Sequence, residues 1–306
     1  MRIAVTGGAG FIGSHLVDAL AGRGDQVVVV DPRPPHRADV EHADADITDL
    51  VGLRQAFAGC AVVFHLAAVS NVNHVYAGPV EALDVNVGGT GRVWQAARDC
   101  EVGRVLLAST VWVYAAATGP EPLTETSPTE VGGAGHLYTA TKIAAEMVAH
   151  SFQELYGQAF TILRYGIPFG PRMREELVIP RFVRMALARE PISIDGDGSQ
   201  YRNYVYIDDL IDAHLRSLGP AGENATFNLE GPEPVSIRRI TEALAGVLGR
   251  PLDVSFGPPR PGDYGGREVS GAKAAAELGW VPRIRFEEGL ARFVEWYTEG
   301  AGRRPA

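Results

Sequence analysis

Short apolar runs alternate with longer amphipathic stretches through about residue 165 of the chain. The apolar runs are rich in β-branched residues and bounded by turn residues, which is typical of buried parallel strands. They are residues 2–6, 26–30, 61–66, 104–109 and 159–164. The stretches between them are long and periodic enough for helices, and they are residues 15–23, 50–58, 80–100 and 137–156. This alternation predicts an α/β fold with a doubly wound parallel sheet of the Rossmann type.

The composition changes after Gly170, where Pro, Gly and Arg become more frequent. Shorter elements are predicted in this part, around residues 178–190, 204–217, 236–249 and 286–298. We therefore expect a smaller C-terminal α/β region. The two predicted domains are residues 1–170 and 171–306, with elements able to interleave across the boundary.

The overall composition narrows the class of protein. With 306 residues and 46% hydrophobic content, the chain can fill a sizeable core. A net charge of −9 argues against a nucleic-acid-binding protein, which would carry a basic surface. Cys60 and Cys100 have neither metal-ligand spacing nor that of a disulfide framework, and the chain shows no signal-peptide or membrane-span pattern. We expect a cytoplasmic protein that binds neither nucleic acid nor membrane.

A glycine-rich segment follows the first predicted strand and opens the first predicted helix. Gly7, Gly10 and Gly13 have GxxGxxG spacing, with Phe11 and Ile12 inside the motif. The first glycine permits a tight turn, the second lets the backbone approach a pyrophosphate, and the third allows close helix–strand packing. The helix N-terminus adds unpaired N–H donors and positive potential. The segment therefore predicts a dinucleotide site.

The end of the second predicted strand carries an acidic residue, Asp31, about 20 residues after the glycine motif. A carboxylate at this place can accept hydrogen bonds from the ribose hydroxyls of the adenosine and would repel a 2′-phosphate. This predicts NAD rather than NADP as the cofactor. Arg33 and Arg37 follow closely and could moderate that preference.

Chemistry is predicted at the other end of the same region. Tyr138 and Lys142 are four residues apart on a predicted helix, so their side chains project from one face. A neighbouring ammonium lowers the pKa of a phenol and lets it act as a general base. Ser109 and Thr110 end the fourth predicted strand, where doubly wound folds place their ligands. A hydroxyl there can hold the reacting oxygen of a substrate.

Together with these features, the motifs of nearly the whole chain resemble the extended short-chain dehydrogenases/reductases, in particular the UDP-glucose 4-epimerase-like members of the nucleotide-sugar epimerase/dehydratase family. The further motifs that carry the resemblance are Asp46-Ile47, His65-Leu66-Ala67-Ala68, Asn86-Val87-Gly88-Gly89-Thr90, Ser109-Thr110-Val111-Trp112-Val113-Tyr114, Arg164-Tyr165, Gly170-Pro171-Arg172, Gly196-Asp197-Gly198, Arg202-Asn203-Tyr204-Val205-Tyr206-Ile207-Asp208-Asp209, Arg260-Pro261-Gly262-Asp263 and Leu278-Gly279-Trp280.

The resemblance implies roles for individual positions, with NAD bound by the first domain and a nucleotide sugar by the second. Tyr138 would be the catalytic base, Thr110 the catalytic hydroxyl, and Lys142 would also contact the nicotinamide ribose. Arg202 and Arg260 would grip the diphosphate, because a guanidinium fork suits phosphate oxygens. The expected substrate set also includes Ile179. The expected cofactor set comprises Gly7, Gly10, Phe11, Ile12, Gly13, Asp31, Arg33, Asp46, Ile47, Leu66, Ala67, Ala68, Asn86, Ser109, Tyr138, Lys142 and Tyr165.

The chain departs from the family pattern at three places. Dehydratases of this group follow the catalytic Thr with Asp-Glu, whereas this chain has Val111-Trp112, which argues against elimination. Gly166-Ile167 stands where many sugar epimerases carry an aromatic residue and a diphosphate-binding Asn. Ala115 replaces the usual Gly after Tyr114. These departures indicate a specialised sugar pocket.

The expected reaction is inversion at C4 of a nucleotide sugar through a transient 4-keto intermediate, with NAD regenerated in each cycle. Net reduction of a nucleotide-linked 4-keto sugar is an alternative that uses the same residues, and decarboxylation of a nucleotide-linked uronic acid is another. A non-catalytic dinucleotide sensor is disfavoured because Tyr138, Lys142 and Thr110 are all present. No metal site is expected, since the histidines lack ligand spacing. The resemblance also implies a homodimer formed by the helices at 80–100 and 137–156.

Overall fold

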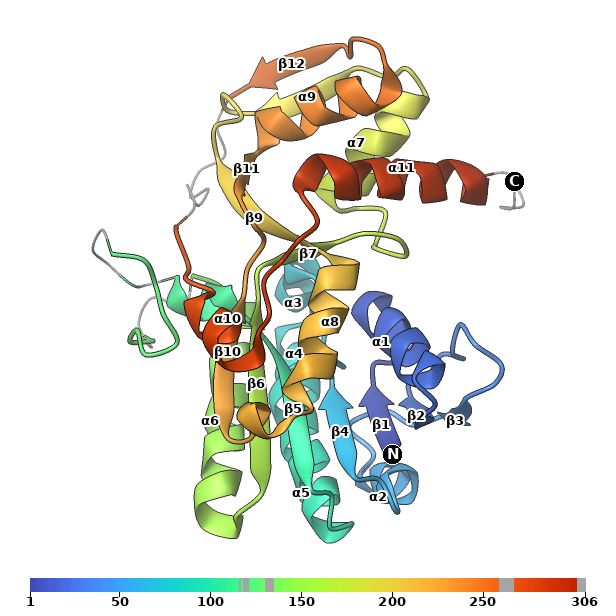
Figure 1. Cartoon of the computed structure of the whole chain (residues 1–306), viewed down its shortest axis with the longest axis vertical. Helices are drawn as coiled ribbons and strands as arrows, with labels where there is room; N and C mark the ends of the chain where they lie inside the picture. Colours follow the sequence, from blue (N-terminus) through green and yellow to red (C-terminus); the bar gives the residue numbers. More distant parts are fainter. Residues whose placement is uncertain (116, 118–120, 130–134, 259–266, 302–306) are drawn as a thin grey trace. The chain divides into compact units, whose positions relative to one another are not determined.

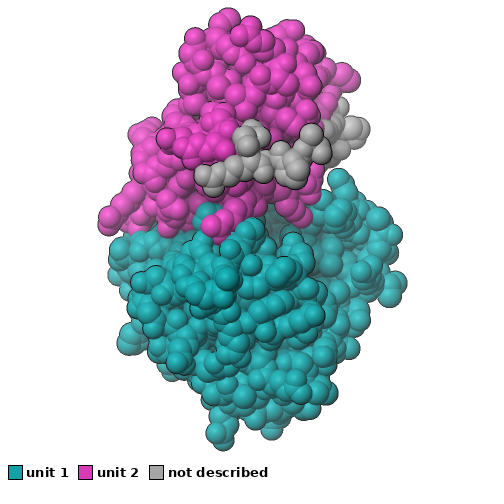
Figure 2. All heavy atoms as spheres, turned by 90° about the vertical axis from the view of Figure 1, so that its right-hand side faces the viewer, with its two compact units in different colours: residues 1–165, 211–229, 269–280 teal, residues 166–210, 230–268, 281–306 magenta. Residues whose placement is uncertain are grey.

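The computed structural model describes residues 1–115, 117, 121–129, 135–258 and 267–301. The chain divides into two compact units, coloured separately in Figure 2. Unit 1 consists of Met1–Tyr165, Ile211–Leu229 and Val269–Trp280. Unit 2 consists of Gly166–Leu210, Glu230–Glu268 and Val281–Ala306. The first crossing thus falls five residues before the predicted boundary at 170, and two later segments return to unit 1.

Unit 1 contains a seven-stranded parallel sheet (Figure 1), which confirms the predicted fold class. The strand order is β10-β6-β5-β4-β1-β2-β3, so the chain reverses direction across the sheet between β1 and β4. In doubly wound folds this reversal is where ligands bind, outside the carboxyl ends of the strands. The strands are β1 (Arg2–Thr6), β2 (Gln26–Val30), β3 (Glu41–Ala43), β4 (Val62–His65), β5 (Arg104–Thr110), β6 (Ala159–Tyr165) and β10 (Ala225–Leu229).

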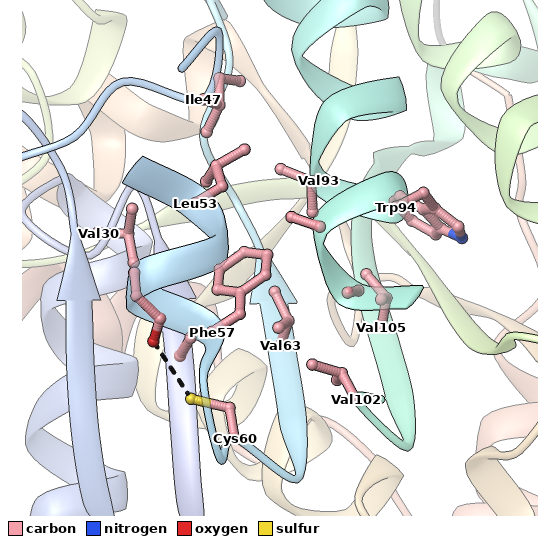
Figure 3. Close-up of a cluster of buried hydrophobic side chains, with 14 of the residues drawn as sticks. Val30, Ile47, Leu53, Phe57, Cys60, Val63, Val93, Trp94, Val102 and Val105 are labelled. Carbon is pink, nitrogen blue, oxygen red and sulfur yellow. Dashed lines mark hydrogen bonds between the residues drawn. The ribbon is translucent and has the colours of Figure 1, made fainter. Parts of the chain in front are cut away.

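Helices cover both faces of this sheet because each presents an apolar stripe to it. On one face, Leu53 and Phe57 of α2 and Val93 of α5 gather over Val30 and Val63 of the sheet (Figure 3). On the other face, α1 and the unit 1 part of α8 lie in front of the strands in Figure 1. The helices that carry unit 1 residues are α1 (Phe11–Gly22), α2 (Leu50–Phe57), α3 (Val72–Ala77), α4 (Pro79–Leu83), η1 (Asp84–Gly89), α5 (Thr90–Asp99), η2 (Val111–Tyr114), α6 (Leu137–Tyr156), α8 (Ile207–Ser217), η4 (Pro220–Gly222) and α10 (Ala272–Leu278).

The single helix predicted at 80–100 is interrupted. It consists of α4, a π-helical turn η1 and α5. The sequence there contains Gly88 and Gly89, which are poor helix formers. A β-carbon on Gly89 would lie 2.7 Å from Cδ1 of Ile47, so the missing side chain allows Ile47 to pack against the turn. Single π turns inside helices are frequent at functional sites.

Unit 2 contains a three-stranded sheet of order β11-β9-β7 and a two-stranded sheet of β12 and β8. The element predicted at 204–217 is in fact the end of a strand, β9, followed at once by helix α8. The elements first named here are β7 (Ile167–Phe169), α7 (Val178–Leu187), β8 (Ile192–Asp195), β9 (Tyr201–Tyr206), β11 (Pro234–Ser236), α9 (Ile237–Leu248), β12 (Val254–Gly257) and α11 (Phe286–Ala301). None of the helices in the described part of the chain has the length and apolar character that a membrane span needs.

Candidate active site

The glycine motif forms a tight loop between β1 and α1 in which side chains would clash. Gly7 has a φ of +71°, a conformation that favours glycine, and its added β-carbon would lie 2.8 Å from the N atom of Ala67. A β-carbon on Gly13 would lie 2.1 Å from the carbonyl oxygen of Gly7. Gly10 caps α1 without a side-chain hydrogen bond, which leaves the first N–H groups of the helix available to an anion. This backbone cradle fits the pyrophosphate of a dinucleotide.

Asp31 lies directly beside this loop, at the carboxyl end of β2. Its carboxylate accepts hydrogen bonds from the N–H of Ala9 (3.2 Å) and of Arg33 (3.0 Å). The Arg33 guanidinium also pairs with it at 3.2 Å, although the Arg33 side chain is 68% exposed and that of Asp31 only 4%. Arg33 is therefore tied to the acid that was predicted to select NAD, which keeps both residues at the edge of the cradle.

Another residue of the predicted cofactor set, Asn86, lies in the π-helical turn η1. Asn86 is buried and holds the loop after β4, because its Oδ1 accepts from Val69 N (2.7 Å) and its Nδ2 donates to Val69 O (3.0 Å). Its Nδ2 also lies 3.1 Å from Thr141 Oγ1, on the helix that carries Tyr138 and Lys142. Asn86 thus links the cofactor side of unit 1 to the chemical side.

Other members of the predicted cofactor set lie in the loops after β3 and β4. Leu66, Ala67 and Ala68 are partly buried and follow β4 directly. Ile47 is buried in the core cluster, whereas the Asp46 side chain is exposed and accepts from the Thr48 hydroxyl at 2.7 Å.

Tyr138 and Lys142 lie in the first turns of α6, as predicted from their spacing. The Nζ of Lys142 lies 5.9 Å from the centre of the Tyr138 ring and donates to the carbonyl oxygen of Ala108 at 2.9 Å. Burial lowers the pKa of Lys142 to about 8, and the charge of Glu146 opposes that shift. A positive charge close to a phenol is the arrangement that favours its ionised form.

The end of β5 lies against this helix. Thr110 is buried, and its Oγ1 accepts from the N–H of Trp112 at 3.2 Å. Ser109 points instead into the interior, where its hydroxyl donates to Glu146 Oε1 at 2.5 Å. Because Ala108 binds Lys142 and Ser109 binds Glu146, two of the last three residues of β5 are hydrogen-bonded to α6.

Two more aromatic rings surround Tyr138. The ring of Trp112 lies edge-on to that of Tyr138 at 6.3 Å between centroids, and His136 lies 4.9 Å from Trp112 and 6.1 Å from Tyr138. His136 also caps α6 through its Nδ1. Burial lowers the pKa of His136, so its ring is neutral at pH 7. These two rings therefore add no charge beside Tyr138.

Tyr165, at the end of β6, is buried, and its hydroxyl lies 2.6 Å from Nε2 of His214 in α8. Burial, together with the neighbouring Tyr138, raises the pKa of Tyr165 well above its usual value. Tyr165 is therefore a neutral phenol committed to His214, which suits a packing and hydrogen-bonding role.

Two of the residues predicted to bind substrate, Ile179 and Arg202, lie in unit 2. Ile179 is fully buried in α7. Arg202 lies on β9, where its Nη1 donates to the carbonyl oxygen of Tyr201 at 2.7 Å. Arg260 falls outside the described residues. The predicted roles of these three residues stay predictions.

Sequence reasoning missed the buried polar groups behind the site. Glu146 and Arg164 form an ion pair of 2.6 Å in which each side chain is 8% exposed. His65 bridges Thr6 (2.8 Å) and Thr90 (3.0 Å), and burial, helped by the charge of Lys142, lowers its pKa to about 3. The position of Glu146, four residues after Lys142 on a helix, was the one local signal available.

Comparisons with known proteins agree with this geometry. A model of the NAD dependent epimerase/dehydratase family matches residues 3–229. The UDP-glucose 4-epimerase of Mycolicibacterium smegmatis is 36% identical over 312 residues, which cover 97% of this chain and 98% of that protein. The crystal structure of the Thermotoga maritima UDP-glucose 4-epimerase with UDP-glucose matches with a TM-score of 0.90 and 30% identity, covering 98% of this chain and all of that one. MoeE5 in complex with UDP-glucuronic acid and NAD matches with a TM-score of 0.89 and 31% identity, covering 98% and 100% of the two chains.

Proposed function

Because the chain belongs to the NAD-dependent epimerase/dehydratase family, we propose that it inverts C4 of a UDP-linked hexose through a bound 4-keto sugar. Family membership confirms the resemblance found from the sequence. It also confirms NAD as the cofactor and an NAD-dependent nucleotide-sugar epimerase as the class of enzyme. The nucleotide, the sugar and the roles of individual residues are the parts that we propose here.

One observation carries the proposal: Lys142 lies beside the ring of Tyr138 on α6 and donates to Ala108 of β5, two residues before Thr110 at the end of that strand. Tyr138, in the phenolate form that the charge of Lys142 stabilises, takes the proton of the C4 hydroxyl as general base and becomes the neutral phenol. The Thr110 hydroxyl holds the C4 oxygen. When bound, NAD would supply the acceptor for the C4 hydride and, once reduced, the hydride that returns to the opposite face of the sugar. The backbone cradle at Gly7 and Gly13 is the part of the chain that would hold the cofactor pyrophosphate.

The residues that follow Thr110 favour return of the hydride over loss of water. Val111 and Trp112 carry neither an acid nor a base, so elimination of a neighbouring hydroxyl has no proton carrier at these positions. The diphosphate of the substrate would be gripped by Arg202 and Arg260, as the sequence predicts.

The rings beside Tyr138 favour a neutral sugar over a uronate. Trp112 and a neutral His136 offer no positive charge to a sugar carboxylate, and burying that carboxylate without a partner is costly. We therefore propose UDP-glucose and UDP-galactose as the better substrates, and UDP-glucuronate and UDP-galacturonate as the poorer ones. A Trp112→Ser variant should narrow the difference in kcat/KM between the two pairs.

The decisive experiment incubates the purified protein with UDP-glucose or UDP-galactose, without added NAD, and follows sugar stereochemistry by NMR. Interconversion in both directions without net NADH formation supports the proposal. A Tyr138→Phe variant should lose about 10²–10⁴-fold in rate, because the base is removed while the ring remains. Turnover of 4-keto sugars alone, with stoichiometric consumption of NAD(P)H, would instead identify a reductase. Release of CO₂ from UDP-glucuronate would identify a decarboxylase.

We propose a homodimer formed through α4 and α6 of unit 1. Both helices expose apolar side chains that the sheet does not cover: Val80 and Leu83 on α4, and Met147, Leu155 and Tyr156 on α6. Exposed apolar groups of this kind mark protein–protein interfaces. Light scattering should give twice the mass of the 32.7 kDa chain, and Met147→Glu should shift it towards the monomer. An unchanged mass in that variant would rule out this face.

We propose the cytoplasm as the compartment. Cys60 and Cys100 are both unpaired thiols in the structure, as suits a reducing environment. Cell fractionation of the native host tests this directly, and recovery of the protein in the extracellular fraction would contradict it.

A further inference from the structure

A buried network of polar side chains lies behind the catalytic pair in unit 1. At its centre the Glu146 carboxylate of α6 binds the Arg164 guanidinium of β6 at two points, Nε to Oε1 at 3.0 Å and Nη2 to Oε2 at 2.6 Å. Oε1 also accepts the hydroxyl of Ser109 at 2.5 Å. All three side chains are buried. The carboxylate is thus fixed from two neighbouring strands of the sheet.

The network is held rigidly on its far side. Arg164 Nη1 donates to the hydroxyl of Tyr114 at 2.5 Å, and that hydroxyl donates to Asn228 Oδ1 at 2.9 Å. The N–H of Asn228 in turn donates to Glu125 at 2.7 Å. Arg164 therefore has little freedom to leave Glu146.

The near side of the network reaches Lys142. Glu146 follows Lys142 by four residues on α6, so the two side chains share one face of the helix. Lys142 is buried, and its Nζ donates to the Ala108 carbonyl, one residue before Ser109. Burial works against its charge, and Glu146 is the group that supports it.

The groups around Lys142 on other elements do not replace Glu146. His65 of β4 is neutral because it is buried. Tyr165 of β6 is a neutral phenol. Tyr138 on α6 becomes negative only when it gives up its own proton, and Arg164 of β6 is positive. Among the described residues that interact with Lys142, Glu146 is thus the carboxylate that supports the charge of the lysine.

We propose that Glu146 is a positioning residue that keeps Lys142 charged for catalysis, and that Arg164 and Ser109 hold its carboxylate in the place where it does so. The inference rests on the proposed role of Lys142 beside Tyr138. It assigns a function to Glu146, which the Tyr138–Lys142 spacing alone does not reveal.

The chain makes a direct test practical, because it contains only two lysines, Lys142 and Lys273. Protein labelled with ¹³C at the lysine ε-carbon gives two signals. In the Lys273→Arg variant the one remaining signal is that of Lys142, and the Glu146 variants are made in this background. In Glu146→Gln the titration midpoint of Lys142 should fall by one pH unit or more relative to Lys273→Arg. In Glu146→Asp, which keeps the charge, the Lys142 midpoint should fall by no more than about half as much as in Glu146→Gln.

Kinetics give a second readout. In Glu146→Gln the alkaline limb of the kcat profile should move to lower pH with the Lys142 midpoint, while KM at neutral pH stays within about twofold. A merely structural role would lower kcat at every pH without moving the limb, and that result would overturn the proposal. If Glu146→Gln fails to fold, the double variant Glu146→Leu/Arg164→Met removes both buried charges, and Lys142 should still titrate lower than in Lys273→Arg.

The NMR and kinetic results separate this inference from the proposed function. An unchanged Lys142 midpoint in both the Gln and the double variant would refute the role of Glu146 whatever the enzyme does. A lowered midpoint in a protein without epimerase activity would leave the role of Glu146 intact and refute the proposed function.

Discussion

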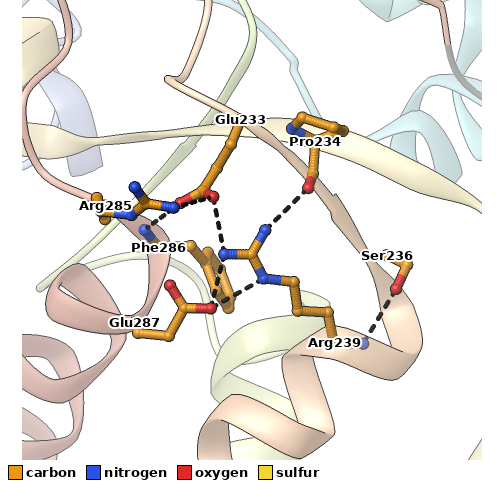
Figure 4. A network of polar contacts seen from close by, with 7 residues as sticks. All are labelled: Glu233, Pro234, Ser236, Arg239, Arg285, Phe286 and Glu287. Atoms are coloured by element: carbon orange, nitrogen blue, oxygen red, sulfur yellow. Dashed lines mark hydrogen bonds and ion pairs between the residues drawn. The ribbon is translucent and has the colours of Figure 1, made fainter.

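Arg164 in unit 1 and Arg239 in unit 2 each bind carboxylates, but in opposite surroundings. Arg164 meets Glu146 in the interior, with both side chains 8% exposed. Arg239 meets Glu233 at 2.9 Å and Glu287 at 2.7 Å, and Glu233 also binds Arg285, as Figure 4 shows. In that second network the side chains of Arg239 and Glu287 are 28% and 46% exposed. The same chemistry therefore serves two environments.

The difference shows that burial decides how much a charge pair affects stability. An exposed pair gains little, because water and salt screen it and its side chains lose freedom. A buried pair is different, since removing one partner leaves an uncompensated charge in the interior. The exposed network of unit 2 joins β11, α9 and the start of α11 at the surface. The buried pair of unit 1 stands behind the reacting groups, where it affects both stability and the charge of Lys142.

The largest effect should follow from breaking the buried pair on one side. Arg164→Met leaves the Glu146 carboxylate unpaired and should cost about 3–5 kcal/mol of unfolding free energy. Urea denaturation at pH 7 measures it. The double variant Glu146→Leu/Arg164→Met is the matched control and should recover most of the loss, because no charge is then left unpaired. Equal losses in the single and double variants would mean that packing, not charge, dominates.

Unit 2 has its own buried acid, Glu230, which sharpens the comparison because the described residues provide no cationic partner for it. Glu230 is buried beside Gly166, and its Oε2 has no hydrogen-bond partner in the described part of the chain. Burial raises the pKa of Glu230 to about 8, although a hydrogen bond from the backbone of Gly231 opposes this shift. The folded state therefore holds a proton that the unfolded state releases above about pH 4.5. Stability should fall as pH rises from there to about 8, by about 1.4 kcal/mol for each unit of pKa difference.

The variant Glu230→Gln should abolish this pH dependence and be the more stable protein at pH 9. Thermal melts between pH 5 and 9 test it, with the exposed Glu242→Gln of the same unit as control. Parallel pH curves for wild type and Glu230→Gln would disprove the protonated state of this acid.

A smaller effect is expected from one neutral partner of the buried pair. Ser109→Ala removes the hydroxyl that donates to Glu146 and should cost about 1.5–3 kcal/mol, the usual range for a hydrogen bond to a charged group. The exposed Ser193→Ala on β8 should leave stability unchanged. If Ser109→Ala loses no more unfolding free energy than the control, Arg164 alone satisfies the hydrogen bonding of the Glu146 carboxylate.

The smallest effect should follow from the exposed network. Glu287→Gln removes one carboxylate from Arg239 and should cost less than about 1 kcal/mol, because Glu233 remains and the site is screened. The loss should shrink further in 1 M salt. A salt-independent loss as large as that of Arg164→Met would erase the distinction between the two networks.

Much of unit 1 follows from local patterns. The ranges of β1, β2 and α6 agree with the prediction, because their apolar periodicity and bounding turn residues lie within each segment. Strand β3 was missed because it is short, polar and at the sheet edge. Strand β10 was missed because nothing near Ala225–Leu229 indicates that it pairs with β6, more than sixty residues earlier.

The sequence by itself determined the alternation of the main strands and helices of unit 1, the glycine loop and the shared face of Tyr138 and Lys142, since each depends on residues close together in the chain. Tertiary structure alone decided that Ser109, Glu146 and Arg164 meet and that Glu230 fills the space beside Gly166. Burial and charge pairing are set by segments that the sheet brings together from distant parts of the chain. A local pattern therefore predicts which side chains share a face, but not which of them lose water and must find a partner.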